Sequence, residues 1–176
     1  MKQYEEIYDA AIDNYGIITV EAAGRLGVHR KELLYWTKIG RLEHCGRGVY
    51  RLCHYVPTDY DCYAEALAFV GGDAVVYGES VLALLNLALV NPSRIAVATA
   101  RRVRRTLPSW IQLVKKPSGM DEDNYNGIAC KSLASAIRAC RGGVMKDRLL
   151  DAVRQSKKEG YLSDQESLQL EKEIQT

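Results

Sequence analysis

Hydrophobic and polar positions between residues 16 and 52 first follow the period of a helix and then that of a strand. Residues 20–26 predict a short helix, and Thr19 is suited to accept a hydrogen bond from a free N–H at its start. The apolar face of this helix consists of Ala22, Ala23 and Leu26. Residues 30–38 predict a second helix, and Gly27 supplies the permissive backbone of a tight turn between the two.

The second predicted helix has two chemically different faces. Leu33, Trp36 and Thr37 share one face by their spacing. The opposite face is mostly cationic or able to form hydrogen bonds, and it carries His29, Arg30, Lys31, Leu34, Tyr35 and Lys38. Such a face suits the DNA major groove, where base edges present acceptors. The alternative is an ordinary solvated helix face.

Two short strands follow, at residues 42–45 and 49–52, joined around Gly46, Arg47 and Gly48. The two glycines allow the backbone of a tight hairpin. An arginine at the tip is placed for a phosphate or minor-groove contact. We assign Arg47 and Arg51 to the same DNA interface as the helix. Helix, turn, helix and basic-tipped hairpin together predict a winged helix-turn-helix.

The pattern changes after this segment, and we place a domain boundary in the linker 53–60, which contains Pro57. The predicted domains are 1–55 and 61–176. In the second domain, two predicted helices are followed by three strands and then by three further helices. The predicted helices are 61–70, 80–89, 133–141, 146–159 and 164–174; the predicted strands are 94–100, 110–115 and 128–130. Ser163 and Glu166 form a capping-box motif before the last helix. The fold class is therefore α+β, with a small sheet backed by helices in the second domain.

A second concentration of positive charge follows the first of these strands. It comprises Arg101, Arg102, Arg104, Arg105, Lys115 and Lys116. If the two flanking strands form a hairpin, these side chains share one rim and could bind phosphates through counterion release. The alternative is a solvated loop that protects an edge strand from pairing.

Several of these stretches resemble the AbiEi family of antitoxins. The resemblance lies in Gly16-Ile-Ile-Thr, Leu26-Gly27-Val28, Gly40-Arg41-Leu42 and Gly46-Arg47-Gly48-Val49-Tyr50, and it continues in residues 74–85 and 127–137. Members of the family are transcriptional regulators of type IV toxin-antitoxin and abortive-infection systems. The resemblance implies a repressor that binds double-stranded DNA at repeats in its own promoter. It also implies a paired nucleotidyltransferase-like toxin, neutralised by the second domain without a stable complex.

Composition limits the remaining function classes. The chain has 176 residues, 47% hydrophobic and 26% charged, and a formal net charge of +2. DNA binding must therefore depend on where the cations lie. The N-terminus is not a signal sequence and no apolar run approaches the length of a membrane span. We expect a cytoplasmic protein without membrane association, present as a monomer or weak dimer.

No catalytic or metal site is expected from the sequence. Five cysteines without a C-x-x-C motif indicate reduced thiols. Cys45 and Cys53 would lie more than about 10 Å apart on the predicted hairpin, too far to share a zinc ion. Gly78-Glu79-Ser80 is reminiscent of a nucleotidyltransferase motif, but the next strand has no paired carboxylates. We expect no cofactor and no enzyme activity. The alternative function is a protein- or RNA-interaction module with a structural winged helix.

Overall fold

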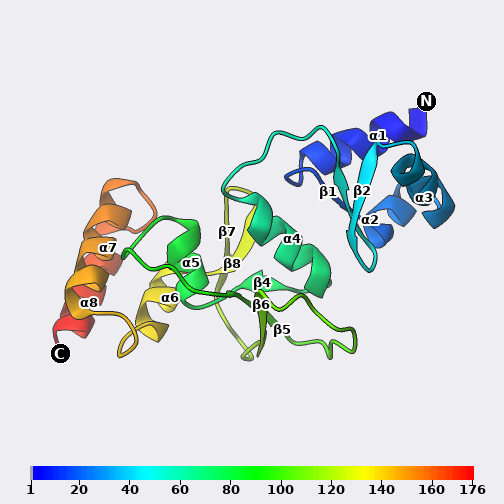
Figure 1. The fold of residues 1–176 in the computed structure, drawn as a ribbon. Helices are drawn as coiled ribbons and strands as arrows, with labels where there is room; N and C mark the ends of the chain where they lie inside the picture. Colours follow the sequence, from blue (N-terminus) through cyan, green and yellow to red (C-terminus); the bar gives the residue numbers. More distant parts are fainter. Residues whose placement is uncertain (1) are drawn as a thin grey trace. The chain divides into compact units, whose positions relative to one another are not determined.

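The computed structural model describes residues 2–176 and has a mixed α+β fold, as predicted (Figure 1). The chain forms two compact units, Met1–Gly71 and Gly72–Thr176. Met1, the first residue of the predicted N-terminal domain, lies outside the described residues. Among residues 2–176, no helix has both the length and the apolar character needed to cross a membrane.

The first unit consists of four helices and a three-stranded sheet. Its elements are α1 (Lys2–Ile12), β1 (Ile17–Thr19), α2 (Val20–Arg25), α3 (Arg30–Lys38), β2 (Leu42–Gly46), β3 (Val49–Leu52) and α4 (Asp61–Val70). The strands are antiparallel in the order β1-β3-β2. The predicted ranges of the helix pair and the hairpin agree with these bounds to within one residue. Strand β1 was not predicted.

The core of the first unit lies between α1, α2, α3 and the sheet. Leu33 and Tyr50 are fully buried, and Trp36 packs edge-on against Tyr4 of α1 with ring centroids 5.2 Å apart. Helix α1 contributes Ile7 to the same core. The apolar face predicted for the second helix is therefore the face that fixes α3 to the rest of the unit.

Helix α4 belongs to the first unit, although its sequence was predicted to lie in the second domain. The intervening segment does not act as a free linker, because Tyr55 lies against the backbone at Gly16 and the rings of Tyr60 and Tyr15 are in tilted contact, with centroids 5.7 Å apart. The carboxylate of Glu65 also accepts a hydrogen bond from Arg51 of β3. The compact unit consequently extends to Gly71, beyond the predicted limit of 55.

The second unit contains a five-stranded mixed sheet and four helices. Its elements are β4 (Val75–Val76), α5 (Glu79–Leu84), β5 (Ile95–Thr99), β6 (Ile111–Lys115), β7 (Glu122–Tyr125), β8 (Ile128–Lys131), α6 (Leu133–Ala139), α7 (Lys146–Lys158) and α8 (Asp164–Gln175). The strand order is β6-β5-β4-β8-β7. Helices α7 and α8 lie side by side, shown in orange and red in Figure 1.

Two features of this sheet differ from expectation. Strands β5 and β6 pair in parallel, with Thr99 opposite Lys115, so the predicted hairpin between them is wrong. The chain between them must instead return along the sheet, since parallel neighbours need a crossover. Strand β7 was not predicted, because Glu122–Tyr125 has no apolar alternation. It is formed by pairing with β8 across a tight turn in which Asn126 and Gly127 both have positive φ.

Candidate nucleic-acid interface

Local sequence fixes the turn between α2 and α3. The Thr19 hydroxyl accepts a hydrogen bond of 3.1 Å from the N–H of Ala22, which confirms its predicted role as a cap. Gly27 has φ of +74°, a conformation that side chains with a Cβ rarely adopt. Val28, which follows this turn, is buried and so anchors the start of α3 to the core.

All five predicted DNA-contact residues on the outward side of α3 are exposed, namely His29, Arg30, Lys31, Tyr35 and Lys38. Leu33 and Trp36 on the other side are buried, so the two faces separate as the spacing predicted. Two apolar residues, Leu34 and Ile39, are about half exposed in the same region. The exposed surface of α3 is therefore mixed, with cations around apolar groups.

The hairpin places Arg47 at its tip, where the side chain is exposed. Gly48 has φ of +77°, and its carbonyl accepts a 2.9 Å hydrogen bond from the N–H of Val20 at the start of α2. The tip is thereby tied to the helix pair by the backbone. The register shifts between His44 and Gly46, which marks a bulge next to the tip.

Arg51 does not share the exposed surroundings of the other predicted contact residues. Its Nη2 donates to the carboxylate of Glu65, and the side chains of Arg51 and Glu65 are only 32% and 15% exposed. Burial raises the pKa of Glu65, and the neighbouring guanidinium opposes that shift. Since its charge is already paired within the fold, we leave Arg51 out of the interface proposed below.

The predicted basic patch in the second unit is also partly neutralised. Lys116 donates to the backbone carbonyl of Asp73 at 2.8 Å and pairs with the Glu122 carboxylate at 2.7 Å. Its side chain is only 11% exposed. The guanidinium of Arg101 lies over Gly72, where a Cβ would collide with it. Arg101 nevertheless remains exposed, as do Arg102, Arg104, Arg105 and Lys115.

The parallel pairing of β5 and β6 still brings the two basic segments together. Parallel neighbours end at the same edge of a sheet. The segment after Thr99 and the end of β6 at Lys115 therefore border one another, and both line a surface pocket of about 370 Å³. Of the six predicted cations, Arg101, Arg102 and Lys115 line this pocket, and parallel pairing rather than a hairpin brings them together.

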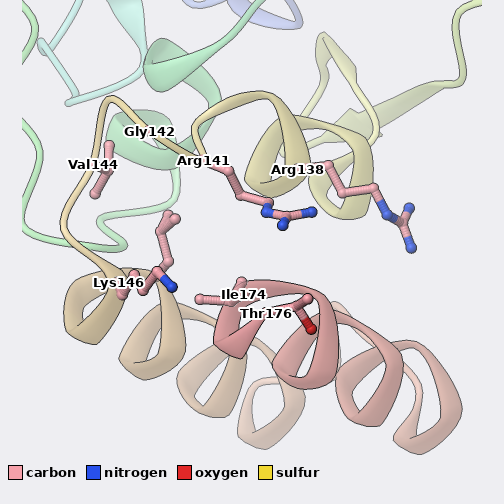
Figure 2. Close-up of a pocket in the computed structure, with 8 residues that line it drawn as sticks. Arg138, Arg141, Gly142, Val144, Lys146, Ile174 and Thr176 are labelled. Carbon is pink, nitrogen blue, oxygen red and sulfur yellow. The ribbon is translucent and has the colours of Figure 1, made fainter.

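A second pocket of about 400 Å³ lies between α6, the start of α7 and the end of α8 (Figure 2). Arg138, Arg141 and Lys146 contribute to its wall, and Leu149 and Ile174 are buried beneath it. Arg138 is paired with Glu173 at 2.8 Å, which lowers the pKa of that carboxyl group. The C-terminal end of α8 lies in the pocket, and cations complement the partial negative charge of such an end. The charge of Arg138 is therefore accounted for by the fold, whereas Arg141 and Lys146 are exposed.

The side chains that could act as catalytic groups have structural roles instead. Ser80 is 1% exposed, and its Oγ accepts a 2.9 Å hydrogen bond from the N–H of Ala96. Burial raises the pKa of Cys130 to about 12 and that of Cys140 to about 11, so neither thiol is a ready nucleophile. Within residues 2–176, no group of three or more His, Cys, Asp or Glu side chains is arranged to hold a metal ion.

Sequence reasoning missed the residues that support the hairpin from behind. Phe69 of α4 lies against Gly46, so closely that a Cβ there would collide with the ring. Arg41 lies over the ring of Tyr4, 4.5 Å from its centroid. Gly46 was the residue in the sequence that could have indicated a close contact with the hairpin. Its partner Phe69, however, lies in a helix that was assigned to the second domain.

Comparisons with known proteins found a similar solved structure and a family match for residues 5–52. The RV2827C protein from Mycobacterium tuberculosis has a similar fold, with a TM-score of 0.50 and 13% sequence identity, over 97% of this chain and 71% of that chain. No curated protein is similar enough to this chain to match it. Residues 5–52 match the sequence model of the family described as "Transcriptional regulator, AbiEi antitoxin". The resemblance found in the sequence is thereby confirmed for residues 5–52, which match the AbiEi antitoxin family of transcriptional regulators.

Proposed function

We propose that the first unit is a winged helix-turn-helix that binds double-stranded DNA. In this proposal, α3 enters the major groove and presents His29, Arg30, Lys31, Tyr35 and Lys38 to base edges and phosphates. The β2–β3 hairpin is the wing, and Arg47 contacts a phosphate or the minor groove. The observation that carries the proposal is the exposed face of α3, which presents Arg30, Lys31 and Lys38, beside an arginine-tipped hairpin.

We further propose that the protein represses transcription from its own promoter by binding repeats there, and that it acts as an antitoxin. The family description of residues 5–52 supports both activities. The second unit is then the part that neutralises a nucleotidyltransferase-like toxin, without a stable complex. The exposed cations Arg102, Arg104, Arg105 and Lys115 add phosphate contacts that are largely independent of base sequence. A cytoplasmic location and a monomer or weak dimer follow from this role.

The test is a gel shift on the DNA upstream of the protein's gene with Arg30→Ala and Arg47→Ala. Each substitution should weaken binding by about five- to tenfold, the loss expected when one charged contact of about 1–1.4 kcal/mol is removed. Arg154→Ala is the matched control, because Arg154 is an exposed arginine of the second unit that already pairs with Asp151. If all three variants bind as tightly as the unaltered protein, the DNA interface is misassigned.

A second candidate function is a protein-interaction module. The half-exposed Leu34 and Ile39 favour it, since apolar groups on a recognition surface also suit a protein partner. The two functions differ in their response to salt. The affinity for DNA should fall steeply between about 50 and 200 mM salt. The affinity for a protein partner bound through apolar contacts should change little over the same range.

A further inference from the structure

Helix α4 contacts the β2–β3 hairpin at two points that lie one helical turn apart. Glu65 and Phe69 are four residues apart and so lie on one face of the helix. The carboxylate of Glu65 accepts from Arg51 of β3, and the buried ring of Phe69 lies against Gly46 of β2. One helix face therefore touches both strands of the hairpin.

The contact with Phe69 explains a glycine that the backbone conformation does not require. Gly48 has a positive φ, but Gly46 does not. A Cβ added at Gly46 would overlap the Cε1 and Cζ atoms of the Phe69 ring. The missing side chain thus permits close approach rather than an unusual turn. Gly46 is bonded directly to Arg47, so this contact lies next to the proposed wing tip.

The contact with Glu65 is polar and mostly shielded from solvent. Glu65 is 15% exposed on the side chain, and burial raises the pKa of its carboxyl group while Arg51 opposes the rise. Glu43 of β2 faces Arg51 across the ladder. In the described part of the chain Glu43 forms no ion pair, so Arg51 is directed to α4 rather than to its neighbour in the sheet.

We infer that α4 is a brace that fixes the hairpin, and that Arg47 contributes fully to DNA affinity only while this brace is intact. Strand β2 is at the edge of its sheet and is hydrogen-bonded on one side only. Contact with α4 restricts the motion of the hairpin in the free protein. Less conformational entropy is then lost when the hairpin tip binds DNA. The inference rests on the proposed DNA-binding function, which it extends to Glu65 and Phe69 as positioning residues.

The central experiment is a double-mutant cycle between the brace and the tip, using a duplex from the DNA upstream of the protein's own gene. Phe69→Leu keeps an apolar side chain in the core but removes the ring that touches Gly46. Alone it should weaken binding roughly threefold, and in the Arg47→Ala background it should have no further effect. Equal losses in both backgrounds would show a general loss of stability and would overturn the inference.

Glu65 has a matched control in Glu43. Glu65→Gln and Glu43→Gln each remove one negative charge close to Arg51, so their general electrostatic effects on DNA binding are alike. Only Glu65→Gln should reduce the contribution of Arg47, because only Glu65 pairs with Arg51. An identical response of the two variants would contradict the role of Glu65.

A measurement without DNA separates the brace from the proposed function. Amide hydrogen exchange of residues 42–52 should be about tenfold faster in Phe69→Leu than in the unaltered protein, because local opening exposes the hairpin amides. Unchanged exchange would refute the brace, whatever the DNA result. Faster exchange in a protein that binds no DNA would retain the brace and refute both the DNA-binding function and the role given to Arg47.

Discussion

At the scale of single residues, charged side chains of the same type have different surroundings. Arg51, Lys116 and Arg138 are each paired with a carboxylate of the fold, whereas Arg30 and Arg47 are exposed. A charge that is partly buried requires such a partner, because removal from water is otherwise unfavourable. The cations that remain exposed, rather than the nearly neutral total, determine which surfaces can bind phosphate.

Asp73 gives a prediction at this scale. Its carboxylate accepts from the Thr99 hydroxyl and from the N–H of Ala100 at 2.9 Å, and these bonds, led by Thr99, lower its pKa below the usual 3.8. The stabilisation is present above pH 3.8 and is lost as the pH falls through the lower, folded-state pKa. Asp73→Asn should lower the free energy of unfolding at pH 7 by about 1 kcal/mol and should flatten its decline in acid.

Thermal unfolding, followed by circular dichroism between about pH 2.5 and 7, measures the free energy of unfolding at pH 7 and its decline in acid. This pH range covers the titration of a carboxylate. Asp147→Asn is the control, because Asp147 is exposed on α7. If the free energy of unfolding declines equally in acid for the unaltered protein and for Asp73→Asn, the stabilising role assigned to the Asp73 carboxylate is contradicted.

At the scale of elements, capping signals in the sequence were partly realised. Ser163 accepts from the N–H of Glu166 at 3.2 Å, and the Glu166 carboxylate accepts from the N–H of Ser163 at 2.9 Å, which confirms the predicted capping box of α8. Ser132 is of the same residue type and occupies the N-cap position before α6. Its side chain, however, makes no capping hydrogen bond. A suitable residue type is therefore not sufficient for a cap.

These two serines form a matched pair for measurement. Ser163→Ala should lower the free energy of unfolding by about 1 kcal/mol, because it leaves an N–H at the start of α8 without its acceptor. Ser132→Ala should have a smaller effect, within about 0.5 kcal/mol. Denaturant unfolding of the two variants tests the difference, and an equal loss for both would be inconsistent with the capping box.

At the scale of the whole molecule, sheet topology determines which charges become neighbours. The parallel pairing of β5 with β6 places the segment that follows Thr99 beside the end of β6, and Lys116 then reaches Asp73 and Glu122. The patch left exposed is smaller than the sequence indicated, but it remains positive. Its proposed contact with phosphate has a quantitative consequence.

Removing two of these cations should reduce the salt dependence of DNA binding. For Arg102→Ala combined with Arg104→Ala, the slope of log affinity against log salt should decrease in magnitude by about 1.8, or 0.9 for each lost phosphate contact. The control is Arg154→Ala combined with Lys158→Ala, which removes two exposed cations of α7. An unchanged slope in the Arg102 and Arg104 variant would identify the patch as a solvated loop.

The sequence by itself determined the features that depend on neighbouring residues. The two faces of α3, the Gly46-Arg47-Gly48 turn and the Ser163 cap all arise from side chains a few positions apart, so local spacing was enough to predict them. Five of the seven predicted DNA-contact residues were placed on one exposed helix face by this reasoning. Their role in binding DNA remains a prediction.

Only the tertiary structure decided which distant segments meet. The partner of Arg51 is 14 residues away, and Lys116 and Asp73 are separated by 43. The extent of the first unit likewise depends on packing, because α4 carries no local signal for its neighbours. Strand β7 is different, since the Asn126-Gly127 turn before β8 is a local hairpin signal even though Glu122–Tyr125 has no apolar alternation. Local periodicity specifies which face of an element is apolar, but the choice of partner is made by the packing of the whole chain.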